Sequence, residues 1–289
     1  MTPVRLLHIA GHDLASIAFN ADQPGVPVIL IHGITGSVHF WETNLVAPFR
    51  DYGPCYSLSL PGHYPSVFPS HFTPDDLTAE SIAHVLTLAI RELVGKRPVL
   101  LVGHSTGGFS VLAIAASTPE IAHGVISISG FAHGQWAGVL GMCQKWCRSG
   151  ALGRLGFKLL LSTGKIHYDV FRRFISMYSP NPKRALAYPN IDAILKAAAY
   201  PAYRRLDLDA MTIYFRRMPD IDITPLLPRI AAPALVITGD ADPIVPPAQA
   251  HHIAERVPGA TLAVLESGVG HFTFYEVPET YRETVASWL

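Results

Sequence analysis

Short apolar runs alternate with amphipathic stretches along the first half of the chain. Residues 26–31 (VPVILI) and 97–103 (RPVLLVG) are continuous and rich in β-branched residues, a pattern typical of strands buried on both faces of a sheet. Apolar residues at helical spacing fill 73–93, and a helix of small residues is expected at 107–118. Strands that alternate with helices in this way predict an α/β fold with a mostly parallel sheet flanked by helices. Further strand-like runs lie at 55–60, 123–130, 232–240 and 260–267.

The alternation of strands and helices stops near residue 131 and resumes near residue 232. The residues between carry helical patterns, Gly and Pro breaks and many aromatic side chains, but no strand-like run. We therefore predict one α/β core formed by residues 1–131 and 227–289, with a helical cap inserted at 132–226. At the amino end, the loose alternation of the first twenty residues around Gly11 favours a β-hairpin.

Composition and charge narrow the classes of function. The chain has 289 residues, with 22 Lys and Arg against 22 Asp and Glu, and this neutrality argues against a nucleic-acid partner. Its apolar runs are far shorter than the roughly 18 residues of a membrane span, and no secretory signal is recognised. A metal site at Cys143 and Cys147 would need further metal ligands nearby, and none are evident in the sequence. We therefore expect these two cysteines to pack in the core. These features predict a cytoplasmic monomer or homodimer that needs no metal and no cofactor.

A serine between glycines ends one of the predicted buried strands. Residues 103–107 (GHSTG) match the pattern G-x-S-x-G, in which Ser105 follows a strand and precedes a helix. One interpretation is a tight turn that only needs small residues. The other is a nucleophile raised above the sheet edge on a strained turn, where Gly103 and Gly107 leave out the Cβ atoms that would clash. The strand-to-helix context favours the nucleophile.

Five motifs together resemble the α/β-hydrolase superfamily over nearly the whole chain, in that family's order. The resemblance implies a serine nucleophile, a base from a late histidine and an orienting carboxylate, in the order Ser, Asp, His. It also places a helical cap after the strand that ends near residue 130. The motifs are IHGITG (31–36), LPGHYPS (60–66), GHSTGG (103–108), TGDADPIVP (238–246) and GVGHFTF (268–274).

The resemblance selects the partners of Ser105 among many candidates. His271 stands in the glycine-bracketed loop after the last strand and matches the late histidine of the family. Asp242 stands three residues after the glycine of TGDADP, where the family places its acid, whereas we expect the neighbouring Asp240 to shape the loop. We exclude His104 as the base, because adjacent side chains on a strand point to opposite sides.

Attack on a carbonyl creates an oxyanion that requires preset donors. One should be the backbone N–H of Thr106, the residue after the predicted nucleophile. By resemblance, the second is the backbone N–H of Ile34. Gly33 would let that loop approach the site, and we expect His32 to brace the loop rather than to take part in the chemistry.

The predicted activity is hydrolysis of an ester or thioester of a small hydrophobic molecule through an acyl-enzyme on Ser105. The aromatic residues of the insertion either shape an apolar pocket for this substrate or form only the insertion's own core. Carbon–carbon bond hydrolases, cyanohydrin lyases and cofactor-free peroxidases resemble the chain in the same motifs and remain open. A different class of function is a non-catalytic receptor for a small molecule.

Overall fold

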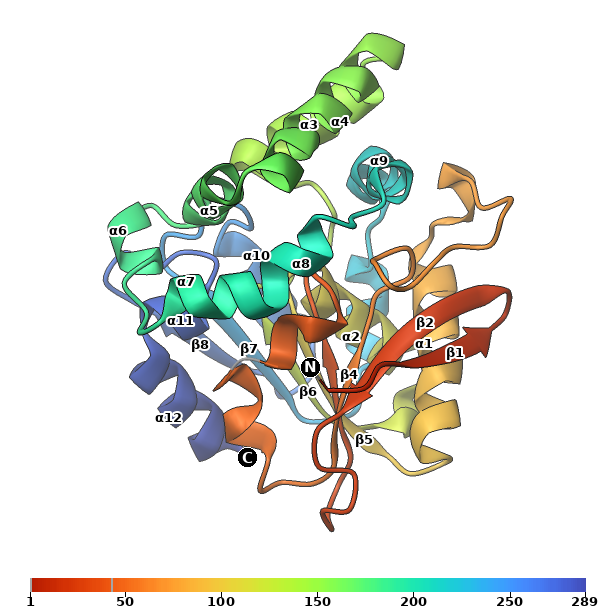
Figure 1. The fold of residues 1–289 in the computed structure, drawn as a ribbon. Helices are drawn as coiled ribbons and strands as arrows, with labels where there is room; N and C mark the ends of the chain where they lie inside the picture. The colour runs from red at the N-terminus through yellow and green to blue at the C-terminus, as the bar shows by residue number, and fades with distance from the viewer. Residues whose placement is uncertain (1, 43) are drawn as a thin grey trace.

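A computed structural model describes residues 2–42 and 44–289, which form an eight-stranded sheet flanked by helices (Figure 1). The short apolar runs identified in the sequence form strands, as predicted. The strands are β1 (Arg5–Ile9), β2 (His12–Ala18), β3 (Val28–Ile31), β4 (Cys55–Leu58), β5 (Val99–His104), β6 (Ala122–Ile128), β7 (Ala234–Gly239) and β8 (Thr261–Leu265).

The strand order is β1-β2-β4-β3-β5-β6-β7-β8, and every pair from β4 onward is parallel. Strands β1 and β2 form the predicted hairpin and are antiparallel to each other, and β2 is antiparallel to β4. The hairpin turn needs a left-handed backbone at both Ala10 and Gly11, with φ of 48° and 82°. The parallel strands are buried along their whole length in the centre of the sheet, which explains their continuous apolar sequences.

Twelve α-helices surround the sheet in the described part of the chain. The longest core helix begins later than expected, because Pro74–Asp76 form a separate 3-10 turn closed by Thr73. Thr78 then caps the α-helix through Ser81, whose N–H and hydroxyl complete a capping box. The helices are α1 (Ala79–Val94), α2 (Thr106–Ser117), α3 (Gly138–Arg148), α4 (Ala151–Ile166), α5 (Tyr168–Ser176), α6 (Pro182–Ala185), α7 (Ile191–Ile194), α8 (Tyr200–Tyr203), α9 (Leu208–Arg217), α10 (Ala248–Ala254), α11 (Thr273–Glu276) and α12 (Pro278–Trp288).

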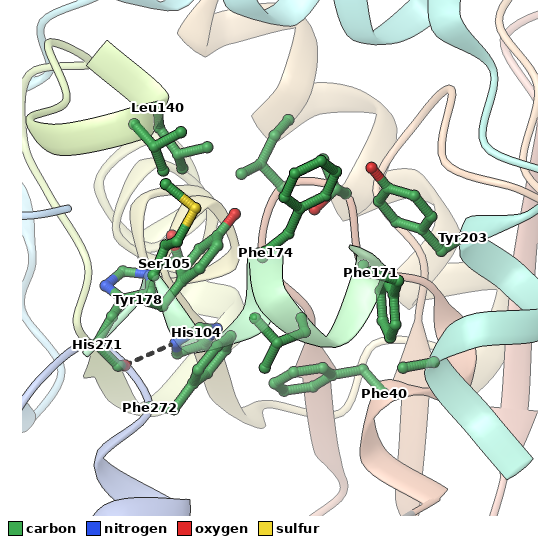
Figure 2. Close-up of a pocket in the computed structure, with 18 of the residues that line it drawn as sticks. Phe40, His104, Ser105, Leu140, Phe171, Phe174, Tyr178, Tyr203, His271 and Phe272 are labelled. Carbon is green, nitrogen blue, oxygen red and sulfur yellow. Dashed lines mark hydrogen bonds between the residues drawn. The ribbon is translucent and has the colours of Figure 1, made fainter. Parts of the chain in front are cut away.

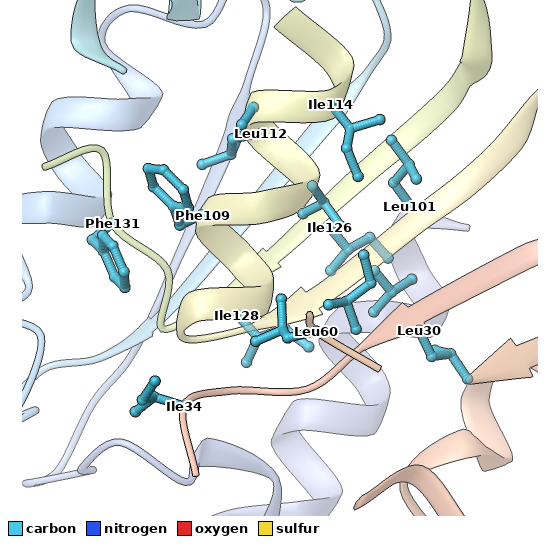
Figure 3. Packing of buried hydrophobic residues seen from close by; sticks show 14 of the residues in the cluster. Leu30, Ile34, Leu60, Leu101, Phe109, Leu112, Ile114, Ile126, Ile128 and Phe131 are labelled. Atoms are coloured by element: carbon cyan, nitrogen blue, oxygen red, sulfur yellow. The ribbon is translucent and has the colours of Figure 1, made fainter. Parts of the chain in front are cut away.

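The core is packed between the sheet and helix α2, which is buried along nearly its whole length. Figure 3 shows Ile114 on the side of this helix that faces Leu101 of β5, whereas Phe109 lies on the other side, where its ring stacks on that of Phe131. Burial of large apolar side chains contributes roughly 1.5–3 kcal/mol each before entropy is counted. This packing fixes α2, and with it the turn that carries Ser105.

Helices α3–α9 all lie between β6 and β7 in the chain, and Figure 1 shows them above the edge of the sheet where the parallel strands end. The predicted fold class, an α/β core with an inserted helical cap, is confirmed. The bounds of 132–226 for the cap stay a prediction. Among the described residues, no helix is both long and apolar enough to cross a bilayer.

Candidate active site

Four loops meet at the edge of the sheet where the parallel strands end. Strand β3 leads to Ile34, β5 to Ser105, β7 to Asp242 and β8 to His271. Because parallel strands place all their carboxyl ends on one edge, residues far apart in sequence are brought together there. The topology therefore gathers the sequence-predicted residues at one place.

Ser105 lies on a strained turn between β5 and α2. Its backbone has φ 55° and ψ −116°, a conformation that side-chain-bearing residues rarely adopt. A Cβ added to Gly103 would lie 2.1 Å from the carbonyl oxygen of Gly107, and one added to Gly107 would lie 2.1 Å from that of Ile31. Both glycines are therefore required by close backbone contacts, as the motif indicated.

Asp242 and His271 form a buried pair. Oδ2 of Asp242 lies 2.7 Å from Nδ1 of His271, while its Oδ1 accepts the backbone N–H groups of Ile244 (2.8 Å) and Val245 (3.0 Å). Nε2 of His271 is buried and has no hydrogen-bond partner among the described residues. His271 and Ser105 line the same cavity (Figure 2). The carboxylate thus fixes one ring nitrogen and leaves the other for a reacting group.

Asp240 fastens the loop that precedes the histidine. Its Oδ1 accepts the N–H of Val269 (2.7 Å), and its Oδ2 accepts those of Ser267 (3.0 Å) and Gly268 (3.1 Å). Although burial opposes it, these backbone donors hold the pKa of the Asp240 carboxyl below its usual value. These contacts match a loop-shaping role for Asp240.

His104 lies in the site, which the alternation argument did not anticipate. Its ring is 4.8 Å from the ring of His271, centroid to centroid, and its Nε2 lies 3.2 Å from the carbonyl oxygen of His271 (Figure 2). The same oxygen accepts the hydroxyl of Ser129 (3.0 Å). Both His104 and Ser105 line the cavity because Ser105 leaves the strand with a positive φ of 55°, which breaks the alternation of side chains there. Burial, followed by the nearby His271, lowers the pKa of His104 well below the usual value, so the His104 ring that contacts His271 is neutral.

His32 is tied into the loop that follows β3. Its Nε2 accepts the N–H of Leu60 (3.2 Å), which leaves Nδ1 to donate to the carbonyl oxygen of Gly33 (2.8 Å). Burial lowers the pKa of His32 to about 4, consistent with a neutral ring. The side chain therefore connects two loops and does not reach the cavity.

Two backbone donors lie beside Ser105. An ideal Cβ on Gly33 would lie only 3.0 Å from Cβ of Ser105, so the loop that carries Ile34 touches the serine. Thr106 begins α2 directly after Ser105. Neither the N–H of Ile34 nor that of Thr106 is paired with a backbone carbonyl in the described part of the chain. Such open donors can bind an anionic oxygen.

Residues that the sequence did not indicate join the insertion to the histidine loop. The N–H of His271 donates to the carbonyl oxygen of Tyr178 (2.9 Å). Glu276 is buried, and its Oε2 accepts the hydroxyl of Ser179 (2.8 Å) and the N–H of Gly270 (3.1 Å). Burial raises the pKa of this carboxyl. Only the position of Glu276 five residues after His271 could have drawn attention to it.

A cavity of about 200 Å³ lies between the sheet edge and the inserted helices. Its lining is mainly aliphatic and aromatic, with polar groups gathered near Ser105, and Figure 2 shows Phe171, Phe174 and Tyr203 at the other end. Residues 2–42 and 44–289 contain no group of three or more His, Cys, Asp or Glu side chains placed to hold a metal ion.

Comparison with known proteins places this geometry in a family. The profile described as "Alpha/beta hydrolase family" matches residues 28–284. "Putative carbamate hydrolase RutD" of Pseudomonas syringae pv. syringae (strain B728a) is 26% identical over 273 residues, which cover 93% of this chain and 95% of that protein. "Pyrrolizixenacetamide deacetylase" of Xenorhabdus hominickii is 24% identical over 277 residues, 95% of each chain.

The fold is similar to solved structures as well. The crystal structure of the enol-lactonase from Burkholderia xenovorans LB400 superposes with a TM-score of 0.75 at 17% identity, covering 98% of this chain and 99% of that one. A hydrolase from Pseudomonas aeruginosa PA01 gives a TM-score of 0.76 at 19% identity, over 99% and 97% of the two chains. Because the family model matches most of the sequence, the chain belongs to the alpha/beta hydrolase family.

Proposed function

We propose that the protein is a serine hydrolase that cleaves esters or thioesters of small hydrophobic molecules through an acyl-enzyme. The observation that supports this most directly is Ser105 on its strained turn, in one cavity with a histidine whose Nδ1 lies 2.7 Å from a buried carboxylate. A neutral serine is a weak nucleophile, and a base oriented in this way is what makes it reactive.

In the proposed reaction, Oγ of Ser105 attacks the substrate carbonyl carbon and passes its proton to Nε2 of His271. The carbonyl oxygen becomes an oxyanion, which accepts the N–H groups of Ile34 and Thr106. When the tetrahedral carbon collapses, the proton moves from His271 to the leaving alcohol or thiol. Water, deprotonated by His271, then releases the acid from Ser105. Asp242 keeps the histidine in the tautomer that both steps need.

The shape of the cavity supports a small, apolar acyl group. Its volume of about 200 Å³ is below the roughly 300–1,000 Å³ of common ligand pockets. The polar groups lie at the end with Ser105 and His271, whereas Phe171 and Phe174 line the other end. An ester would place its carbonyl at the polar end and its hydrocarbon part among the aromatic rings.

Fluorophosphonate labelling tests the nucleophile. Wild-type protein should gain one adduct, located by mass spectrometry on Ser105, and the Ser105→Ala variant should gain none. His271→Ala should be labelled far more slowly. An unlabelled wild type, or an adduct on another serine, would count against every serine-hydrolase function.

A substrate series then separates the chemistries that share these residues. Aryl esters with acyl chains of increasing length, acyl thioesters and a carbamate ester, the last suggested by the name of the RutD relative, should show a preference for short to medium apolar acyl groups. A vinylogous 1,5-diketone tests carbon–carbon cleavage, and turnover of that compound alone would replace the proposal. Saturable binding without turnover of any compound would indicate a receptor.

A further inference from the structure

The neutrality of the whole chain conceals a strong separation of charge. Residues 132–226 contain 14 Lys and Arg against six Asp and no Glu, whereas the remaining residues contain 8 Lys and Arg against 16 Asp and Glu. The inserted segment is therefore strongly cationic and the core strongly anionic. Such an asymmetry indicates a polyanionic partner for the cationic part.

The helices α3 and α4 carry the densest part of this charge. Residues 138–166 contain five cationic side chains and no acidic one. Arg148 pairs with Asp220, and Lys158 pairs with Asp209. Lys145 forms no ion pair in the part of the chain that the structure describes, and neither does Arg154. These two cations are available to an external anion.

Helix α4 also exposes a stripe of large apolar side chains. Leu152 is 85% exposed, Leu155 53%, Leu159 59% and Ile166 69%. Their spacing of three, four and seven residues places all four on one narrow face of the helix. The opposite face of α4 carries Phe157, which is buried in the protein. Helix α4 is therefore apolar on two faces, the one that packs on the protein and the one that is exposed to solvent.

The stripe continues onto α3 and toward the cavity. An ideal Cβ on Gly156 would lie 3.8 Å from the ring of Trp146, so this tryptophan, which is 36% exposed, borders the α4 stripe. One turn earlier on α3, Met142 is exposed and also lines the cavity. Met177 shares both properties. The cavity thus reaches the surface beside the exposed apolar face, and Figure 1 shows α3 and α4 projecting from the rest of the molecule.

We propose that the projecting face of α3 and α4 docks on an anionic lipid membrane surface. Helices that lie in a membrane interface combine exposed Leu and Trp on one face with Lys and Arg beside it, the combination found here. Nucleic acid would use the cations but leave four exposed aliphatic side chains without a role. A second copy of the chain would bring two cationic faces together. Docking would place the mouth of the cavity against the lipid phase, where apolar esters concentrate.

Vesicle flotation tests the docking. Wild-type protein should float with vesicles of phosphatidylcholine and phosphatidylglycerol, and much less with phosphatidylcholine alone or at high salt. The triple variant Leu152→Ser/Leu155→Ser/Leu159→Ser should bind more than about tenfold more weakly. Neutralising Lys145 and Arg154 with Gln should cost about fivefold for each charge. The emission of Trp146 should shift to the blue on binding, and this shift should be absent in Trp146→Phe.

Two controls separate docking from folding and from catalysis. Leu6→Ser removes an exposed leucine from β1, away from α3 and α4, and should bind vesicles like wild type. The triple variant should keep the circular dichroism spectrum of the wild type and its turnover of a soluble short-chain ester. Ser105→Ala should bind vesicles fully, so docking and hydrolysis stand or fall separately.

Three results would overturn the proposal. The first is equal binding of the triple variant and the wild type to anionic vesicles. The second is tighter binding to duplex DNA than to the vesicles. The third is a wild-type dimer in sedimentation velocity that the triple variant converts to monomer, with no vesicle binding by either, which would assign the stripe to a second copy of the chain.

Discussion

The carboxylate of Asp242 is held so that only one of its oxygens can face His271. Its Oδ1 accepts two backbone N–H groups, from Ile244 and Val245, and Oδ2 is left for the ring. In an Asp242→Asn variant, the amide oxygen would keep the two backbone donors, and the NH₂ group would face Nδ1. The ring would then carry its proton on Nε2 and could not accept one from Ser105. We expect kcat for ester hydrolysis to fall about 10⁴-fold with little change in thermal stability.

Asp240→Asn is the matched control, because it makes the same chemical change two residues away. Asp240 accepts three backbone N–H groups in the loop before His271, and an amide has only one acceptor oxygen. This variant should lose thermal stability and keep far more of its activity than Asp242→Asn. Steady-state kinetics and thermal melts of both variants decide the matter, and the reverse ranking in activity would assign the acid to Asp240.

At the scale of elements, the turn between β5 and α2 allows no extra atom. A Cβ on Gly107 would lie 2.1 Å from the backbone oxygen of Ile31 at the end of β3, so neither a rotamer change nor a small shift can relieve the clash. Gly107→Ala should therefore lower the free energy of unfolding by more than about 3 kcal/mol and abolish labelling of Ser105. Gly156→Ala, on the open face of α4, should leave stability equal or slightly higher. Urea denaturation measures both, and comparable losses would contradict the packing argument.

The contact between Glu276 and Ser179 joins the insertion to the histidine loop. Burial raises the pKa of Glu276, so the folded state retains a proton that the unfolded state releases, and stability is lost as the pH rises from about 4.5 through the raised value. Glu276→Gln cannot ionise and should gain in melting temperature relative to wild type as the pH rises through this window. Glu279→Gln, on exposed α12, should show no such trend. Melts across the pH range would refute the idea if the two variants behaved alike.

The strands could be predicted from the sequence more completely than the loops and the contacts between distant residues. Buried parallel strands can be predicted from sequence because both of their faces must be apolar. Strands β3, β5 and β7 lie where their apolar runs predicted them. Helix α1 begins five residues after Pro74 because a local capping turn outcompetes the helical pattern there. The position of His104 in the site depends on the positive φ of Ser105, which no periodic pattern in the sequence predicts. Tertiary contacts such as that of Glu276 with Ser179 join residues 97 positions apart, so no local pattern could show them.

At the scale of the molecule, the parallel sheet explains why the site residues predicted from sequence lie close together. The topology places the carboxyl ends of the six parallel strands, β3 to β8, on one edge, so motifs that follow these strands lie close together. The shape of the inserted helices follows from no comparable rule. Phe171 and Phe215 both line the cavity and belong to the buried hydrophobic core. Aromatic residues of the insertion can therefore shape the pocket and form the insertion's core at the same time.

We expect the buried histidines of the core to make the fold less stable in acid. His32, His63 and His104 are fully enclosed, and burial lowers the pKa of His32 to about 4 and those of the other two well below the usual value. As the pH falls below about 6.5, the unfolded chain binds protons that the folded chain cannot accept, so the free energy of unfolding falls toward pH 4. Each such histidine should contribute a slope of about 1.4 kcal/mol per pH unit within its window.

His63 offers the cleanest test, because it lies outside the candidate site and its Nε2 has no hydrogen-bond partner in the described residues. The His63→Gln variant should lose one histidine's share of this acid sensitivity. His251→Gln, on the exposed face of α10, should keep the wild-type slope. Urea unfolding of the three proteins between pH 7.5 and 5 measures the slopes directly. If the free energy of unfolding of His63→Gln fell as steeply with pH as that of wild type, the folded protein would have to accept a proton at His63. Opening of the core, and not a buried neutral histidine, would then govern the response to acid.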